Sequence, residues 1–274
     1  MRGLIGVDIG GSGIKAGVVD SRRGVLVGER VRVPTPQPAT PDAVVAATAE
    51  LVASLGPTQG PVGIGVPGPI VRGRVLMMAN MDTSWVGQPA AKLFGDAIGR
   101  PVTVLNDADA AAVAEMRFGA GRGVKGTVLV LTLGTGIGSA LFVDGVLVPN
   151  LELGHIEIRG KDAERRASAG ARERHGLSFK EWAPVLDEYL DRIDQLIWPD
   201  LIILGGGVSK RSEKFVPLLS VRPPVVAAAL RNEAGIVGAA VRARMLESAA
   251  RPPRVTSATR ATPARRRTPA GSAP

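Results

Sequence analysis

The chain has 274 residues, and 45% of them are hydrophobic but only 3% aromatic, so the core must consist mainly of Val, Ile, Leu and Ala. This length allows one or two domains with a large buried core, and an aliphatic core suits packed α/β layers. The absence of cysteine excludes disulfides, thiol catalysis and cysteine-ligated metal sites.

The formal net charge of +9 is concentrated at the C-terminal end. Residues 251–274 contain six arginines and no acidic residue, which leaves +3 for the rest of the chain. This segment consists mostly of Arg, Pro, Ala, Ser and Thr without hydrophobic periodicity, and predicts a disordered basic tail. A nucleic-acid-binding or polyanion-binding arm is one interpretation of the tail. We favour an extension that only aids solubility, and therefore expect no nucleic-acid partner.

The N-terminus shows no signal peptide, because Met1-Arg2 leads directly into an apolar strand. No apolar stretch reaches the roughly 18 residues needed to span a bilayer. We expect a soluble, cytoplasmic protein without a membrane partner.

The first part of the chain predicts an α/β unit with short strands and two helices. Asp42 is the expected N-cap of the first helix, which ends before Gly56-Pro57. The expected strands are Leu4–Ile9, Ile14–Asp20, Val25–Val33, Val62–Val66 and Pro101–Leu105, and the helices are Asp42–Leu55 and Pro89–Ile98.

The second part continues the α/β pattern and contains a strong hairpin signal at Asp144-Gly145. The expected strands are Thr127–Leu133, Ile137–Val143, Val146–Val148, Leu201–Leu204 and Val225–Leu230. The expected helices are Ala110–Phe118, a long helix from Ser178, a helix-like segment at 212–219, and Gly235–Ser248.

Three glycine-rich turns each follow a predicted strand: Gly10–Gly13, Gly134–Gly138 and Gly205–Gly207. Glycine tolerates positive φ and has no Cβ, so such turns can direct backbone N–H groups toward an anion. None matches the P-loop or the dinucleotide-binding spacing. One such turn alone can be an ordinary hairpin, but three together predict phosphate binding.

Polar residues suited to a sugar lie beside these turns. Glu152, His155 and Glu164 follow the second turn, and Asp107 stands where a strand passes into a helix. A carboxylate is needed to take the proton of a hydroxyl nucleophile during phosphoryl transfer. Taken alone, Asp107 suits a helix N-cap and His155 suits a structural role; the combination with the glycine turns favours phosphoryl transfer to an alcohol.

Three motifs resemble the phosphate and adenosine motifs of the actin/hexokinase superfamily: GVDIGGSGIKAGVVD, LTLGTGIGSALFVDG and LIILGGGVSK. Within it, GVPGPI, NMDTSW, VLNDADAAAVAE and ELGHIE resemble the repressor/ORF/kinase (ROK) family of sugar kinases. The stretches AEMRFGAGRGVKGTV, LVPNLELGHIEIRGKDAERRAS and NEAGIVGAA resemble the subgroup of actinobacterial glucokinases that use polyphosphate. The resemblance extends from Leu4 to about Ala243.

The resemblance implies an α/β protein with the two-domain, actin-like ATPase (ribonuclease H-like) fold and a cleft between the domains. Residues 1–105 would form the N-terminal domain, with the helix 235–248 packing back on it. Residues 106–234 would form a larger domain with the phosphate and sugar motifs. The resemblance also implies a homodimer.

The implied reaction transfers a terminal phosphoryl group from inorganic polyphosphate, and possibly also ATP, to the 6-hydroxyl of glucose. Asp107 matches the family's general base, and Asp8 matches the residue that orders Mg²⁺ through water. Asp109 is then a structural acid. The residues matching sugar contacts are Gly68, Asn80, Asn106, Asp107, Glu152, His155 and Glu164, with Glu157 a weaker candidate. The residues matching donor contacts are Asp8, Gly10, Gly11, Ser12, Gly13, Lys15, Thr132, Gly134, Thr135, Gly136, Gly206 and Gly207.

Many ROK relatives carry a cysteine-rich zinc motif between the positions of His155 and Glu164. This chain has no cysteine, so we expect no zinc site and interpret His155 as a sugar contact. A glucokinase or mannokinase that uses ATP alone is the main alternative. A sugar-responsive regulator is a remote one, because such regulators carry a DNA-binding helix-turn-helix before the kinase fold and the first strand here begins at Leu4.

A polyphosphate chain needs an extended track of basic side chains. The alternative for any scattered Lys or Arg is a solvated surface. The candidates are Arg122, Lys125, Arg165, Arg166, Lys210, Arg211 and Lys214.

Overall fold

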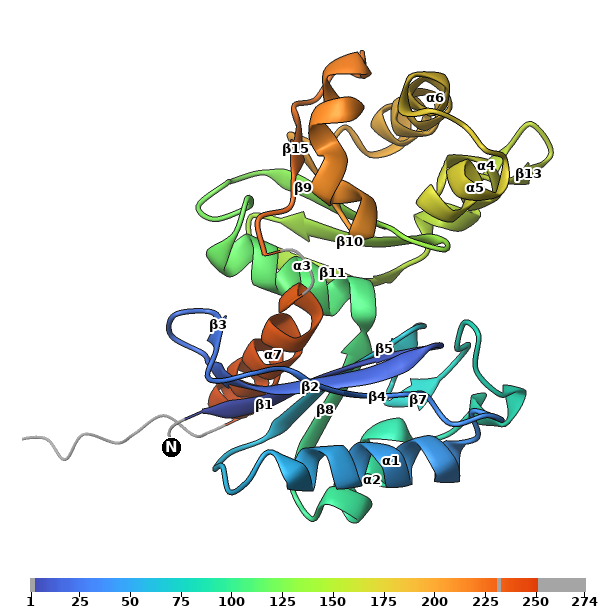
Figure 1. Cartoon of the computed structure of the whole chain (residues 1–274). Helices are drawn as coiled ribbons and strands as arrows, with labels where there is room; N and C mark the ends of the chain where they lie inside the picture. Colours follow the sequence, from blue (N-terminus) through green and yellow to red (C-terminus); the bar gives the residue numbers. More distant parts are fainter. Residues whose placement is uncertain (1–2, 231–232, 251–274) are drawn as a thin grey trace, which may run out of the picture.

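The computed structural model describes residues 3–230 and 233–250, and the predicted basic tail lies outside this range. Two α/β units stand one above the other, joined by a shared layer of two helices (Figure 1). Within the described residues, no helix combines the length and apolarity that a membrane crossing needs.

The first unit contains a six-stranded sheet whose main order is β3-β2-β1-β5-β8, with β4 also paired to β2. The predicted strand Val25–Val33 is wrong: the segment forms two short strands that flank Gly28, whose φ of 88° interrupts extended backbone. The strands are β1 (Leu4–Gly10), β2 (Gly13–Asp20), β3 (Val25–Leu26), β4 (Val31–Val33), β5 (Val62–Val66) and β8 (Val102–Asn106).

Helices α1 (Pro41–Ser54) and α2 (Ala90–Ile98) cover the outer face of this sheet (Figure 1). The N-cap of α1 is Thr40 rather than the predicted Asp42: the Thr40 hydroxyl accepts from the N–H of Ala43, while Asp42 lies in the first turn. A small hairpin, β6 (Ile70–Val71) and β7 (Arg74–Val75), and a 3₁₀ turn, η1 (Thr83–Trp85), complete the unit.

The second unit contains a five-stranded sheet of order β11-β10-β9-β14-β15, and α6 buries Trp182 and Tyr189 against one face of it. Its strands are β9 (Thr127–Leu133), β10 (Ile137–Val143), β11 (Val146–Leu151), β14 (Leu201–Gly205) and β15 (Val225–Ala227). Its helices are α4 (Glu164–Ala167), α5 (Ala169–Arg174) and α6 (Phe179–Ile197). Shorter pieces are η2 (Leu153–His155), β12 (Glu157–Ile158), β13 (Lys161–Asp162), η3 (Gly207–Lys214) and η4 (Val216–Leu218).

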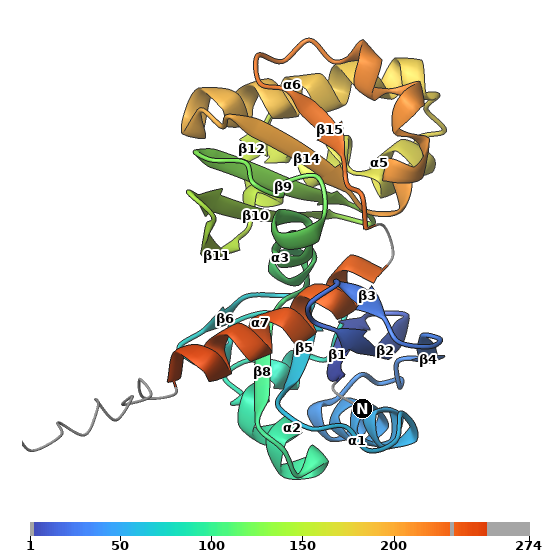
Figure 2. The same cartoon turned by 90° about the vertical axis from the view of Figure 1, so that its left-hand side faces the viewer.

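Helices α3 (Asp107–Phe118) and α7 (Ala234–Ala250) lie between the two sheets (Figure 2). Their backbones approach closely because small residues face each other: a Cβ on Gly238 would lie 1.6 Å from the carbonyl oxygen of Ala110. Gly6 of β1 and Gly63 of β5 likewise leave room for the backbone of α7. The last helix of the chain is therefore packed onto the first sheet.

Buried Glu115 fixes the crossover from the second unit to α7. Its carboxylate accepts hydrogen bonds from the backbone N–H groups of Ala120, Ala229 and Leu230 at 2.9, 3.0 and 2.7 Å. The carboxylate thus ties the C-terminal end of α3 to the segment that leads into α7.

Candidate active site

A cavity of about 380 Å³ opens between the two units, at the N-terminal end of α3. Residues from both units line it, and most of the residues that matched sugar and donor contacts are among them. These are Gly10, Gly11, Gly68, Asn80, Asn106, Asp107, Thr132, Gly134, Thr135, Gly136, Glu152, His155, Glu164 and Gly206.

Asp107 is the first residue of α3 and follows directly on the carboxyl end of β8. The N-cap is Asn106, whose Oδ1 accepts from the N–H groups of Ala108 and Asp109 at 2.8 and 3.2 Å. The capping role considered for Asp107 thus belongs to its neighbour. Asp107 itself lines the cavity.

The pKa of Asp107 is raised from the ordinary value of 3.8 to about 7. Loss of hydration is the main cause, and the negative charges of Asp8, Glu152 and Asp109 add to it, while a hydrogen bond from the backbone N–H of Ala108 opposes it. A carboxylate whose pKa lies near neutrality can accept a proton from a hydroxyl and still be deprotonated at working pH.

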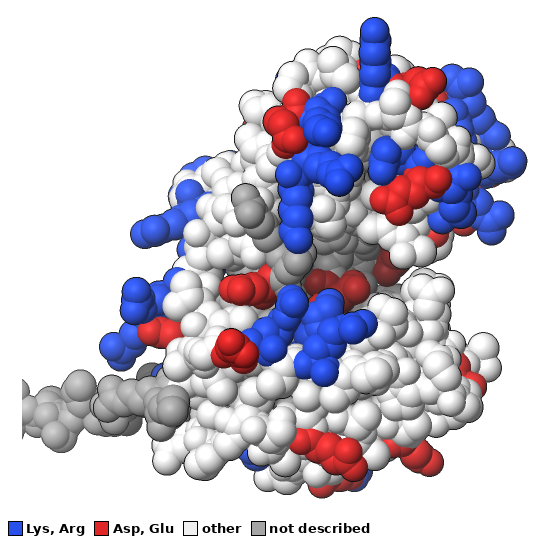
Figure 3. Space-filling view, in the orientation of Figure 1, with Lys and Arg blue, Asp and Glu red and all other residues white. Residues whose placement is uncertain are grey.

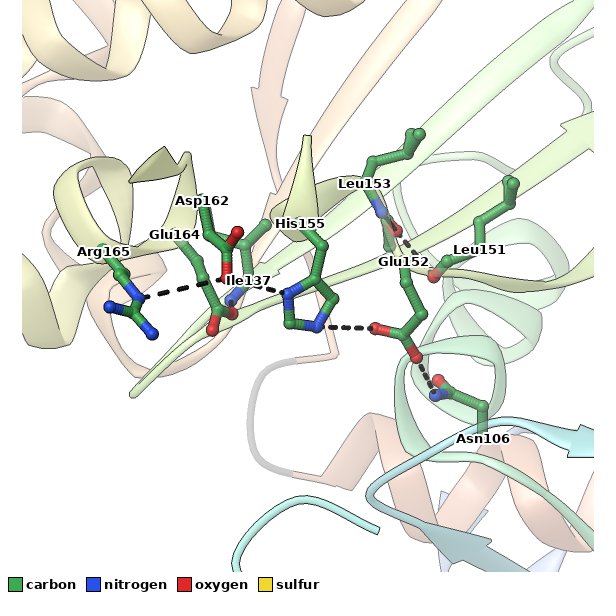
Figure 4. Close-up of polar contacts among 10 residues, drawn as sticks. Asn106, Ile137, Leu151, Glu152, Leu153, His155, Asp162, Glu164 and Arg165 are labelled. Carbon is green, nitrogen blue, oxygen red and sulfur yellow. Dashed lines mark hydrogen bonds and ion pairs between the residues drawn. The ribbon is translucent and has the colours of Figure 1, made fainter. Parts of the chain in front are cut away.

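Glu152 is the N-cap of η2 and His155 is its last residue, and Glu152 faces Asn106 at the end of β8 (Figure 4). Asn106 Nδ2 lies 3.5 Å from Glu152 Oε1, and His155 Nε2 lies 4.0 Å from Glu152 Oε2. The other ring nitrogen of His155 lies 3.4 Å from Asp162 Oδ2. Burial raises the pKa of Glu152, the charge of His155 opposes this rise, and Glu164 reinforces it.

Glu164 begins α4 and reaches back to the second glycine-rich turn, where its Oε2 accepts from the N–H of Ile137 at 3.0 Å (Figure 4). A Cβ on Gly136 would lie 2.3 Å from that oxygen, so only glycine allows this approach. The N–H of Gly170 donates to Gly134 at 2.8 Å, and the Ser168 hydroxyl donates to Thr135. The turn is therefore held from its own unit, with its backbone facing the cavity.

The first glycine-rich turn joins β1 to β2 and packs against the loop that carries Asn80. A Cβ on Gly11 would lie 2.8 Å from Cβ of Asn80, whose own φ is 59°. Beside this turn, Lys15 Nζ donates to Asp8 Oδ2 at 2.9 Å. Ser12 is exposed, and neither Ser12 nor Gly13 lines the cavities described here.

Two further cavities adjoin the central one, since each shares lining residues with it. One, of about 400 Å³, is lined by Asp8, Lys15, Arg30, Arg32, Asp107, Ala108, Ala111, Thr132, Gly206, Gly207, Ala234 and Gly235. The other, of about 440 Å³, is lined by Leu133, Gly134, Thr135, Ala169, Gly170, Arg172, Glu173, Phe179, Gly207, Val208, Lys210 and Arg211. Figure 3 shows Lys and Arg on both sides of the hollow and acidic residues at its base.

The expected basic track is only partly placed near the cleft. Arg122 and Lys125 follow α3 at its other end, about 18 Å from Asp107 along a helix of 12 residues. Arg166 Nη1 lies 3.3 Å from Glu188 Oε2, and Arg165 Nε lies 3.9 Å from Asp162 Oδ2, so both are paired with carboxylates. Lys210 and Arg211 do line a cavity of the cleft.

Sequence reasoning missed Arg30, Arg32 and Arg172, all of which line cavities of the cleft. Arg30 and Arg32 fall in an alternating segment that predicts an ordinary exposed strand edge. Only the pairing of β4 with β2 brings them beside Lys15. Glu157, the weaker sugar candidate, lies on exposed β12 and does not line the three cavities.

The described residues contain no group of three or more His, Cys, Asp or Glu arranged to hold a metal ion. Asp8 and Asp107 nevertheless line one cavity together, and the charge of Asp8 contributes to the raised pKa of Asp107. Two carboxylates facing one cavity suit a hydrated Mg²⁺, which keeps several waters and takes only one or two protein carboxylates.

Two α/β units joined by a shared helical layer, with glycine-rich turns and a near-neutral carboxylate in the cleft, define a sugar kinase of the two-domain, actin-like ATPase fold. The model of the ROK family matches residues 4–173. The chain belongs to the ROK family.

Characterised relatives support this assignment over most of the chain. The chain is 50% identical over 237 residues to a polyphosphate glucokinase of Mycobacterium tuberculosis, covering 86% of this chain and 89% of that protein. Its structure resembles the inorganic polyphosphate/ATP-glucomannokinase of Arthrobacter sp. strain KM, with 56% identity, a TM-score of 0.85, and coverage of 90% and 100%. A ROK family glucokinase of Streptomyces griseus, solved with glucose and AMPPNP, matches with 30% identity, a TM-score of 0.77, and coverage of 89% and 99%.

Proposed function

We propose that this protein transfers the terminal phosphoryl group of inorganic polyphosphate or ATP to the 6-hydroxyl of glucose. The observation that carries the proposal is the position of Asp107. Its carboxyl group has a pKa near neutrality and shares one cavity with the second glycine-rich turn and the polar cluster around Glu152. Relatives named polyphosphate glucokinase and polyphosphate/ATP-glucomannokinase support the same reaction.

Asn106, Glu152, His155 and Glu164 are the proposed sugar contacts, together with Asn80 and the backbone at Gly68. Amide and carboxylate groups form paired hydrogen bonds to neighbouring hydroxyls. When a substrate lacks one of these hydroxyls, the buried polar group that would bind it stays unsatisfied, so the site rejects that substrate. The 6-hydroxyl would then face Asp107, which takes its proton as the phosphoryl group arrives.

The donor phosphates would lie against the glycine-rich turns at Gly10, Gly11, Gly134, Thr135, Gly136, Gly206 and Gly207, beside Thr132. Lys15, fixed by Asp8, supplies a positive charge beside this position. Asp8 would hold Mg²⁺ through water, and the ion would offset charge on the donor phosphates. Closure of the two units would exclude water that otherwise competes with the sugar as acceptor.

Ser12 and Gly13, also matched to donor contacts, are proposed to act through the shape of the first turn. Residues 1–105 with the helix 235–248 and residues 106–234 are the proposed domains that close on the substrates. We also propose a cytoplasmic homodimer without a zinc site.

A kinase restricted to ATP is the second candidate, and the cavity lined by Phe179 and Arg172 favours it because it offers a ring and apolar walls for a nucleoside. A regulator is not favoured, since the relatives at 50% identity are enzymes.

The decisive experiment measures glucose 6-phosphate formation with Mg²⁺, using polyphosphate and ATP as separate donors. Asp107→Asn should lower kcat by about 10²–10⁴-fold, the usual contribution of a general base. Glucose binding, measured by calorimetry, should remain largely intact because the amide keeps the size of the side chain. An active Asp107→Asn variant would refute the assignment of the base.

A further inference from the structure

Three charged side chains form a row across the first sheet, on the face that borders the cleft. Asp8 of β1 lies opposite Lys15 of β2, and Lys15 lies opposite Arg32 of β4. Residues directly opposite on neighbouring strands project to the same face of a sheet. Arg30, two residues before Arg32, lines the same cavity. The row therefore begins beside Asp107 and continues away from it through Lys15, Arg32 and Arg30.

Arg32 is held against the first glycine-rich turn. Its Nη2 donates to the carbonyl oxygen of Ser12 at 3.0 Å, and a Cβ on Gly13 would lie only 2.6 Å from its Nε. The absence of a side chain at Gly13 lets the guanidinium approach the backbone of the turn. A guanidinium has five donors, so this contact leaves others available to a ligand.

Neither Arg30 nor Arg32 forms an ion pair with a carboxylate of the residues that the structure describes. Arg159, Arg166 and Arg222, by contrast, each pair with Glu188 or Asp194. Arg30 and Arg32 thus line a cavity of the cleft without an ion pair to a carboxylate of the described residues, unlike Arg159, Arg166 and Arg222.

The cavity that Lys210 and Arg211 line has a different chemical character. Phe179 lines it, with the guanidinium of Arg172 4.5 Å from the centre of its ring, and Leu133, Ala169 and Val208 add apolar surface. The cavity with Arg30 and Arg32 contains no aromatic residue among its lining residues. Both cavities include Gly207, so two separate exits start from the donor position.

We propose that Lys15, Arg32 and Arg30 bind the phosphates of a polyphosphate chain behind the one that is transferred, while the nucleoside of ATP occupies the cavity at Phe179. A polyphosphate chain offers repeated anionic groups and nothing for an apolar wall to recognise. Successive guanidinium and ammonium groups match such a chain, and guanidinium binds phosphate oxygens with two parallel hydrogen bonds. The row extends roughly 10 Å from Lys15 to Arg30, because it spans one strand spacing and two residues of extended chain.

This inference rests on the proposed function, because it requires that the enzyme accept polyphosphate. The test compares kcat/KM for polyphosphate and for ATP in the wild type, Arg30→Gln and Arg32→Gln. Arg23→Gln is the matched control, since it removes one exposed arginine of the same unit outside the three cavities of the cleft. Glucose is kept saturating, and tripolyphosphate is included as a short donor.

Each of the two variants should lower kcat/KM for long polyphosphate about tenfold relative to kcat/KM for ATP, as the loss of one charge-assisted hydrogen bond allows. The loss for Arg30→Gln should be smaller with tripolyphosphate, which is too short to reach the far end of the row. Arg23→Gln should leave kcat/KM unchanged for both polyphosphate and ATP. The dependence of the polyphosphate reaction on salt should also weaken in Arg30→Gln, because one fewer charge meets the polyanion.

If kcat/KM falls equally for polyphosphate and ATP, or falls for neither, the proposed role of the row in binding polyphosphate is wrong, while the proposed reaction stays intact. A wild-type enzyme that uses ATP but not polyphosphate would instead contradict the assignment of polyphosphate as a donor, and with it the role proposed for the row. Arg30→Gln keeps the test independent of folding, because Arg30 is exposed and, unlike Arg32, is not hydrogen-bonded to the first turn.

Discussion

Asn150, at the end of β11, pairs with both backbone polar groups of Ile70 in the first unit. Its Oδ1 accepts from the N–H of Ile70 at 2.9 Å, and its Nδ2 donates to the carbonyl of Ile70 at 3.0 Å. The N–H of Asn150 itself donates to Asp109 Oδ2 at 3.0 Å. This residue, two positions before Glu152, thus links the second sheet to β6 through its side chain and to α3 through its backbone N–H.

Removing this link should loosen the sugar side of the cleft. Asn150→Ala loses two hydrogen bonds, so we expect the free energy of unfolding to fall by about 1–3 kcal/mol. The KM for glucose should rise more than kcat falls, because the link lies beside the sugar contacts and not beside the donor turns. Steady-state kinetics and urea unfolding measure both effects.

Asn150→Gly is the matched control for backbone strain, because Asn150 has a φ of 63° that glycine adopts freely. If the side-chain pairing matters, the glycine variant should show the same rise in KM as the alanine variant. A glycine variant with wild-type KM would contradict the role of the pairing.

The pH dependence of the reaction should report Asp107. Its pKa is about 7, and a general base acts only when deprotonated, so kcat/KM for glucose should fall about tenfold per pH unit below that value. Polyphosphate and ATP should give the same apparent pKa, which separates ionisation of the enzyme from that of the donor. A flat profile between pH 5 and pH 8 would contradict this assignment.

The same carboxylate should lower the stability of the folded protein at neutral pH. The pKa of Asp107 is raised from 3.8 to about 7, so between these values the folded state keeps a proton that the unfolded state has lost. The free energy of unfolding contributed by this group is therefore fully present below pH 3.8 and is lost as the pH rises through about 7. Asp107→Asn should be more stable than the wild type at pH 8, by on the order of 2–4 kcal/mol.

Denaturant titrations of both proteins at pH 5 and pH 8 test this expectation. The gain from Asp107→Asn should shrink at the lower pH, where the wild-type carboxyl is protonated. Asp109 should add a smaller effect of the same sign, since burial raises its pKa to about 6. A gain that is equal at both pH values would have a cause other than ionisation.

The contact between α3 and α7 should tolerate no side chain at Gly238. Alanine normally stabilises a helix relative to glycine by about 1 kcal/mol. Here a Cβ would lie 1.6 Å from the Ala110 carbonyl oxygen, so Gly238→Ala should instead lower the free energy of unfolding, by about 1–3 kcal/mol or more. The sign of the change, measured by thermal or denaturant unfolding, decides between the two effects.

Activity should not depend on zinc. No group of three or more potential ligands occurs in the described residues, and the chain has no cysteine. A chelator that binds zinc far more tightly than magnesium should leave turnover unchanged in excess Mg²⁺, whereas EDTA without added Mg²⁺ should abolish it. His155→Ala should raise the KM for glucose without changing the zinc content of the purified protein.

Local sequence signals predicted much of the fold. Buried strands such as Thr127–Leu133 have β-branched residues and clear glycine boundaries, and the structure confirms them. The errors fall where two local signals compete. Thr40 and Asp42 lie two residues apart at the start of α1, and both residue types are favourable N-caps. Asn106 and Asp107 compete in the same way at the start of α3. The short helices α4 and α5 were missed because neither is long enough to show a 3.6-residue period.

The arrangement of the candidate site was less accessible from sequence. Motif resemblance selected residues that the fold brings into one cavity, but it carried no information on distances between them. The Asn150–Ile70 pairing joins residues 80 positions apart, and no local pattern marks either partner. The register of β4 on β2 is what places Arg32 beside Lys15. Arg122 and Lys125, two candidates for the basic track, follow the end of α3 that lies away from Asp107, and no local pattern reveals this direction.

The packing of α7 over Gly6 and Gly63 has a consequence for the order of folding during synthesis. The first sheet is complete once residue 106 has been made, yet its inner face is covered by a helix that ends at residue 250. Until that helix is made, a nascent chain would expose an apolar surface and the glycine contacts that receive α7. The N-terminal unit can therefore reach its native packing only after almost the whole second unit has been translated, which makes long-range closure the late step of folding.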